Sequence, residues 1–220
     1  VIICAGEEID MSGEAHSRAR ISVSDSQTAL IKEVCEVNKN TAVVFYCGRP
    51  LALEKIKDVA PATIIFWHPG TEGGNAIANL LFGDVNFQAK LPMSFPYEGQ
   101  SPYCYNHLRT GRPSTNGGYC LGYRDTPYEP VYPFGYGLSY SDFKLENVKL
   151  STEEVSAEGI TVEADITNIG EYDAAQTLQI YVKVEKEGTP NAQLKGLRKV
   201  FLKEGETQHI SLKLGQEAFG

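Results

Sequence analysis

The chain has 220 residues, of which 42% are hydrophobic and 22% are charged, so it is long enough for one large globular domain or two ordinary ones. Its formal net charge of −8 disfavours nucleic acid and anionic membranes as partners. No apolar run approaches the roughly 20 residues of a membrane-spanning helix, so we expect no membrane partner.

Strand and helix patterns alternate along residues 1–95. The run TAVVFYC (41–47) is rich in β-branched and aromatic residues, as buried strands are. In SVSDSQTALIKEVCEV (22–37), Ser24 and Gln27 have the spacing of a capping box, and apolar residues recur at helical intervals. Similar patterns predict further strands at 1–5, 62–67 and 91–95 and further helices at 50–59 and 71–83. Such an alternation favours a parallel sheet with helices on both faces.

Polar loops follow three of these strands: GEEIDMSGE (6–14), GRP (48–50) and WHPG (67–70). The carboxyl ends of parallel strands meet at one edge of the sheet, where open α/β sheets bind their ligands. We therefore expect the functional site at this edge, with the loop that begins at Gly6 as its longest part.

The rest of the chain has a different character. Residues 96–142 are rich in Tyr, Pro, Gly and Asn, which predicts an ordered loop pinned by aromatic rings. From Phe143 onward apolar and polar residues alternate, which predicts a small β-sandwich. The expected fold class is thus α/β, a partial mixed or parallel αβα sandwich at 1–95, followed by a linker at 96–142 and an all-β sandwich at 143–220.

The first loop contains the candidates for chemistry. Glu14 lies between Gly13 and Ala15, which leave room for a ligand to approach, and His16 and Arg18 are placed to orient it or a substrate hydroxyl. Glu7 stands at the strand end, where it either reaches the cleft or serves as a helix-capping or solvated loop carboxylate. Residue types alone favour the alternative, a solvated loop of mixed charge.

A sugar-binding site is a second hypothesis for this edge of the sheet, because aromatic rings and side chains with several hydrogen-bond donors bind polyols well. Trp67, His68, Arg49 and His107 are candidates to line it. Packing explains Trp67 equally well, and a loop-bracing ion pair explains Arg49. The glycines after His68 lack a Walker lysine and a GxGxxG pattern, so a nucleotide-binding domain is the weaker rival. No metal-ligand spacing is evident, and we expect neither a metal nor another cofactor.

The five cysteines show no paired spacing. We expect Cys4, Cys35 and Cys47 to be small buried hydrophobes. Cys104 and Cys120 could pair, but an odd total argues against a disulfide framework. The chain begins inside an expected strand, without Met or a signal peptide, so we expect a fragment of a longer protein. Its localisation stays open, with the cytoplasm favoured.

Four runs of the sequence resemble a known family: GRPLAL (48–53), HPGTEGGNAIANLLFGDVN (68–86), KLPMSFP (90–96) and YPFGYGLSYSDF (132–143). In order and spacing they are similar to the C-terminal half of a glycoside hydrolase family 3 enzyme of the β-glucosidase type. The resemblance covers essentially the whole chain, and HLRTGRP (107–113) also matches the linker of that family.

The resemblance implies a complete enzyme of three parts: a (β/α)8-type barrel, an α/β sandwich domain and a fibronectin type III-like domain. The present chain would lack the barrel and the first strands of the sandwich domain. In such enzymes the nucleophile is an Asp on the barrel, and the general acid/base is a Glu just before a Ser-Arg pair. The run GEAHSR (13–18) maps this second role to Glu14.

The expected function is therefore that of the C-terminal part of a retaining β-glycosidase, which removes terminal non-reducing β-linked sugars. The expected partners are a carbohydrate substrate and the missing barrel of the same chain, and the fragment alone should be inactive. Besides Glu14, we expect the substrate contacts to be Glu7, His16, Arg18, Trp67 and His68. The alternative function is a non-catalytic carbohydrate-binding or interdomain scaffold module.

Overall fold

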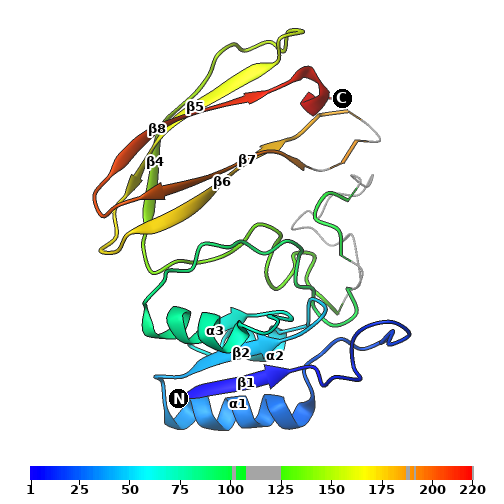
Figure 1. Cartoon of the computed structure of the whole chain (residues 1–220). Helices are drawn as coiled ribbons and strands as arrows, with labels where there is room; N and C mark the ends of the chain where they lie inside the picture. Colours follow the sequence, from blue (N-terminus) through cyan, green and yellow to red (C-terminus); the bar gives the residue numbers. More distant parts are fainter. Residues whose placement is uncertain (101–102, 108–124, 187–188, 191, 220) are drawn as a thin grey trace. The chain divides into compact units, whose positions relative to one another are not determined.

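Figure 1 shows the computed structural model of the chain, which describes residues 1–100, 103–107, 125–186, 189–190 and 192–219. The chain forms two compact units. The first contains the described residues of Val1–Ala78, Pro92–Cys104 and Thr110–Phe134, and the second contains those of Asn79–Leu91, Tyr105–Arg109 and Gly135–Gly220. The domain boundaries expected from the sequence stay predictions.

A three-stranded parallel sheet forms the centre of the first unit, in the order β1 (Ile2–Gly6), β2 (Ala42–Tyr46) and β3 (Ala62–Ile65). Val43, Val44 and Phe45 of the central strand are fully buried, because helices and loops cover both faces of a parallel sheet. The register pairs Gly6 with Tyr46 and Phe45 with Ile65, so the carboxyl ends of the three strands are nearly level. The predicted parallel arrangement is confirmed.

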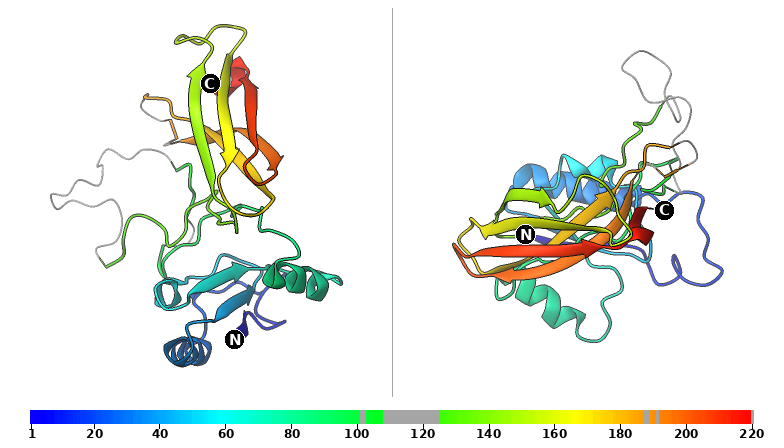
Figure 2. Two further views of the ribbon diagram at one scale, coloured as in Figure 1. Left: turned by 90° about the vertical axis from the view of Figure 1, so that its left-hand side faces the viewer. Right: turned by 90° about the horizontal axis from the view of Figure 1, so that it is seen from above.

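Three helices connect or follow these strands. Figure 2 shows α1 (Asp25–Val37) and α2 (Glu54–Lys57) on one face of the sheet, while α3 (Gly73–Phe82) begins on the opposite face. Helix α1 begins after Ser24, whose Oγ accepts a hydrogen bond from the backbone N–H of Gln27. Gly83 ends α3 with a φ of 83°, the left-handed conformation usual for a glycine after a helix.

Two local predictions are wrong. The expected helix at 50–59 is reduced to α2, because Leu51 and Leu53 are buried on either side of Ala52, which pairs with Ser22 in a parallel bridge. The expected strand at 91–95 is not formed: Phe95 makes an isolated antiparallel bridge with Tyr132, and Leu91 exchanges backbone hydrogen bonds with Gly135 and Tyr136. Pro92 within this run and Pro96 directly after it have no backbone N–H to donate to a sheet.

Two antiparallel sheets form a sandwich in the second unit (Figure 1), which confirms the predicted all-β architecture. One sheet has the order β4 (Phe143–Leu150), β5 (Ile160–Asn168) and β8 (Thr207–Leu214), and the other pairs β6 (Ala174–Val182) with β7 (Gln193–Leu202). A short 3₁₀ helix follows at Gln216–Phe219.

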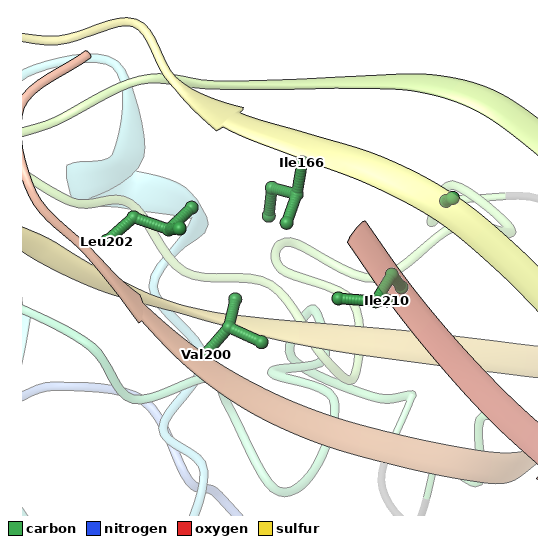
Figure 3. Packing of buried hydrophobic residues seen from close by; sticks show 5 residues of the cluster. Ile166, Val200, Leu202 and Ile210 are labelled. Atoms are coloured by element: carbon green, nitrogen blue, oxygen red, sulfur yellow. The ribbon is translucent and has the colours of Figure 1, made fainter. Parts of the chain in front are cut away.

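The core of the sandwich comes from alternate positions of facing strands. Ile166, Val200, Leu202 and Ile210 point toward one another between the two sheets (Figure 3), and Ala164 completes the buried cluster. These are the positions at which the period-two pattern places apolar residues, because successive side chains of a strand face opposite sides.

Aromatic rings pin the described part of the Tyr-rich segment. In the second unit the rings of Phe87 and Tyr140 lie 5.3 Å apart, and the rings of Tyr105 and Tyr181 lie 6.3 Å apart. The hydroxyl of Tyr140 donates to the carbonyl of Leu80 at 2.8 Å. Most of the run HLRTGRP lies outside the described residues.

The burial of the cysteines agrees only in part with the prediction. Cys35 and Cys47 are buried as predicted, whereas Cys4 is exposed, because alternate residues of the edge strand β1 face away from the core. Cys104 is an exposed free thiol, and Cys120 lies outside the described residues. Across the part of the chain that the structure describes, we find no helix with the length and apolarity needed to span a bilayer.

Candidate active-site loops at the carboxyl edge of the sheet

Loops that follow β1, β2 and β3 emerge at one edge of the parallel sheet, as predicted. Two of these loops leave their strands through a residue with a positive φ, which is 133° at Gly6 and 52° at Trp67. A side chain at Gly6 would overlap the carbonyl of Tyr46, so this position requires glycine.

An open depression of about 470 Å³ lies among these loops. This volume is within the range of about 300–1,000 Å³ that small-molecule sites occupy. Its lining comes from the first loop, the second loop and the residue after Trp67, namely Glu7, Glu8, Ile9, Ser12, Gly13, Gly48 and His68. The depression is therefore built by the elements that the sequence indicated.

Glu7 is a buried carboxylate with three partners. Its side chain is only 2% exposed, and Oε1 lies 3.1 Å from Nη1 of Arg18 and 2.9 Å from Nε of Arg49. Its Oε2 accepts a hydrogen bond from the backbone N–H of Gly48 at 3.0 Å. Two cations and a backbone donor thus offset the cost of burying this negative charge.

Arg49 connects Glu7 to the first loop. Its Nη2 donates to the carbonyl of Met11 at 2.6 Å and to the carbonyl of His16 at 3.0 Å. Its Nε makes no directed hydrogen bond to any residue that the structure describes, so the contact with Glu7 is an ion pair held by charge. Arg49 therefore braces the loop, which is one of the two roles that the sequence left open.

Glu14 stands on the same loop in different surroundings. It is exposed, and it takes part in none of the hydrogen bonds and ion pairs found among the described residues. The backbone N–H of His16 donates to the carbonyl of Gly13 at 3.3 Å, which closes a turn around Glu14. The carboxyl group of Glu14 is thus free to meet a ligand.

The two predicted histidines contact the loop at Ser12. Nε2 of His68 lies 3.1 Å from Oγ of Ser12, and Nδ1 of His16 lies 3.4 Å from the carbonyl of Ser12. Both imidazoles are exposed. A Cβ at Gly48 would stand 2.7 Å from Nε2 of His68, so the second loop passes close under this contact.

The side chain of Trp67 packs against another aromatic ring. Its ring lies 5.7 Å from the ring of Phe95, tilted by 57°, and the side chain is half-buried. The structure places Glu7, Arg18 and His68 at the carboxyl edge of the sheet, beside the loop that carries Glu14. Trp67 is on the adjoining turn, and His107 belongs to the second compact unit.

The negative charge of Glu7 affects a buried thiol beside it. The pKa of Cys47 is raised to about 11, chiefly because the thiol is buried and secondly because Glu7 is nearby. A thiolate is disfavoured there, so Cys47 is a packing residue and not a nucleophile. Among the described residues no group of three or more His, Cys, Asp or Glu side chains is placed to hold a metal ion.

Sequence reasoning missed Ser12 and Gly48, which line the depression, and the double contact of Arg49. Gly48 carried a usable signal, because it directly follows a strand at the expected ligand edge. Ser12 carried none, since its role depends on His68, far away in the sequence.

Comparison with known proteins gives a consistent answer. Residues 1–140 match the glycosyl hydrolase family 3 C-terminal domain, and residues 176–220 match the fibronectin type III-like domain. The periplasmic β-glucosidase of Salmonella typhimurium is 41% identical over 225 residues, which cover 99% of this chain and 29% of that protein. A β-xylosidase of Formosa agariphila is 36% identical over 219 residues, which cover 98% of this chain and 30% of that protein.

A solved structure agrees over the same extent. The crystal structure of a β-glucosidase from Listeria innocua in complex with glucose superposes with a TM-score of 0.92 at 39% identity, covering 99% of this chain and 31% of that one. The chain thus spans about 30% of the length of these relatives, and what it matches is their C-terminal portion. By these matches the chain belongs to glycoside hydrolase family 3, with the family's C-terminal α/β domain followed by a fibronectin type III-like domain.

Proposed function

We propose that this chain is the C-terminal part of a retaining β-glycosidase of the β-glucosidase type, and that Glu14 is its general acid/base. The observation that carries the proposal is the carboxyl of Glu14, which is exposed and has no partner among the described residues, on a braced loop at the ligand edge of a family 3 sheet. The substrate would be a glycoside or oligosaccharide with a terminal non-reducing β-linked sugar. Two relatives, a β-glucosidase and a β-xylosidase, support this substrate class.

The chemistry requires two carboxyl groups in different roles. In retaining hydrolysis one carboxylate attacks the anomeric carbon while a second group about 5–5.5 Å away protonates the leaving oxygen. Glu14 would be the second group, first as acid and then as the base that activates water. The nucleophile would be an aspartate of the barrel that family 3 enzymes carry, outside this chain.

The other proposed substrate contacts are supported unequally by the geometry. His68 lines the depression and His16 is exposed beside it, so both can reach a sugar hydroxyl. Trp67 offers a half-buried ring on the adjoining turn. Glu7 and Arg18 contact each other, and a substrate that used them would have to share that ion pair.

Substitution of Glu14 by alanine in the complete gene product tests the proposal. Loss of a general acid should lower kcat/KM for a plain disaccharide by roughly 100- to 10,000-fold. It should leave a dinitrophenyl β-glucoside much less affected, because that leaving group departs without a proton. The kcat on that activated substrate should still fall, because Glu14 no longer activates water, and added azide should restore part of it by attacking the glycosyl enzyme directly.

Asp10→Asn is the matched control, because it removes another exposed carboxylate of the same loop. Its kinetics should stay close to wild type on both substrates. A Glu14→Ala enzyme that hydrolyses the disaccharide at nearly the wild-type rate would show that Glu14 has a different role.

A further inference from the structure

A single side-chain nitrogen fastens both ends of the turn that carries Glu14. Gly13 and Ala15 have positive φ values of 117° and 63°, so Glu14 stands at the tip of a tight turn. Nη2 of Arg49 donates to the carbonyls of Met11 and His16, one on each side of this turn. The position of the guanidinium therefore sets the position of the turn.

Arg49 is fixed from its other side by Glu7. The carboxylate lies 2.9 Å from Nε of Arg49, and it is itself held by Arg18 and by the N–H of Gly48. The guanidinium is rigid and planar, so the ion pair that keeps its Nε beside Glu7 limits where Nη2 can lie. Buried Glu7 and exposed Glu14 are thereby connected through a rigid group.

We infer that Arg49 is a positioning residue for Glu14: it transfers the fixed location of Glu7 to the turn and so sets where the acid meets the glycosidic oxygen. The inference rests on the proposed role of Glu14. Arg49 acts through the loop and does not touch the substrate. The competing explanation is an ion pair that only stabilises the fold, and such a pair would affect all substrates alike.

Arg49→Ala and Arg49→Lys in the complete gene product distinguish the two explanations. Lysine keeps a positive charge for Glu7 but lacks the planar fork that holds two carbonyls and a carboxylate together. In both variants kcat/KM for a β-linked glucose disaccharide should fall by roughly 100-fold, the cost of misplacing a reacting group by about 1 Å. The value of kcat/KM for a dinitrophenyl β-glucoside should stay near wild type, because its leaving group departs in the first step without a proton.

Arg20→Ala is the matched control. Arg20 belongs to the same stretch of chain, but its side chain is 87% exposed, and its ion pair with Glu98 is long, at 3.9 Å. This variant should keep wild-type rates on both substrates.

A double-mutant cycle supplies a readout that a merely structural role would not give. If Arg49 works through Glu14, adding Arg49→Lys to Glu14→Ala should lower the disaccharide rate little further, because the group to be positioned is already gone. Additive losses would overturn the inference, and so would equal losses on both substrates in the single Arg49 variants. If Arg49→Ala fails to fold, Arg49→Lys decides alone.

The outcomes also separate this inference from the proposed function. If Glu14→Ala shows no difference between the two substrates, the role of Glu14 is wrong whatever Arg49 does. If Glu14→Ala shows the difference and Arg49→Lys does not, only the positioning role of Arg49 is wrong.

Discussion

Glu7 and Glu14 belong to one loop and have opposite surroundings. Glu7 is buried with three donors around it, and Glu14 is exposed with none among the described residues. A buried, fully paired carboxylate cannot protonate a substrate without breaking its ion pairs, whereas an exposed one can approach a substrate. The division of roles between the two acids follows from burial and partners, which composition alone does not show.

The ion pairs of Glu7 should be important for stability. We expect Glu7→Gln to lower the free energy of unfolding by about 3 kcal/mol, because it leaves Arg18 and Arg49 partly buried without a compensating charge. Trp67 is the only tryptophan of the chain and lies in the same unit, so its fluorescence can follow urea unfolding.

Glu98→Gln is the control for this measurement, since Glu98 pairs with exposed Arg20 at 3.9 Å. Its effect should stay within about 0.5 kcal/mol, as is usual for surface pairs. Equal effects of the two substitutions would mean that burial of Glu7 adds nothing to the strength of its ion pairs.

Helix α1 and strand β1 are joined where the first loop begins. The sequence predicted that Gln27 would complete a capping box with Ser24, but only half of that box forms. The side-chain amide of Gln27 instead accepts from the N–H of Gly6 at 2.9 Å and donates to its carbonyl at 3.1 Å. The first turn of the helix thereby fixes the point at which the loop leaves the sheet.

We expect Gln27→Ala to loosen this junction. Loss of both contacts leaves two polar backbone groups of Gly6 unpaired, at a cost of roughly 1–3 kcal/mol. The amide of Gly6 should then exchange with solvent much faster, which hydrogen-exchange NMR can measure against the amide of buried Val44.

Ser24→Ala is the matched substitution one turn earlier. It should cost about 1 kcal/mol through the lost cap and leave exchange at Gly6 unchanged. Fast exchange at Gly6 in the Ser24 variant, or slow exchange in the Gln27 variant, would contradict the proposed junction.

Elements with a complete local pattern were predictable, and elements that depend on distant partners were not. The three parallel strands and α1 have apolar residues at the right period within their own sequence. Phe95 has an apolar run around it, but its partner Tyr132 lies far along the chain, so the pattern suggested a strand that does not form. Gln27 likewise carries a cap signal, while its real partner is Gly6 in a different element.

At the scale of the whole molecule, the two-part architecture was predictable because each part has its own period. Residues 1–95 alternate strand and helix patterns, and the stretch from Phe143 has the period of two that builds the core in Figure 3. The edge that carries the site followed from parallel topology alone. The depression itself did not, because Ser12, Gly48 and His68 meet only after three loops fold together.

The proposed acid/base is one of the two carboxyl groups that retaining hydrolysis needs. The chain spans about 30% of the length of its relatives, and the nucleophile of the proposed mechanism would lie outside it. We therefore expect the purified 220-residue chain to hydrolyse no nitrophenyl β-glucoside, while the complete gene product does. Circular dichroism and cooperative unfolding of the chain would establish that inactivity is not a failure to fold.

Calorimetry on the same folded chain separates the proposed half-site from a carbohydrate-binding module. A site that needs a second domain should give no heat with glucose or cellobiose, because the depression is open and loops at a single sheet edge line it. Saturable binding that His68→Ala abolishes would instead favour the module. Hydrolysis by the isolated chain, lost on Glu14→Ala, would mean that both carboxyl groups reside here and that the barrel supplies neither.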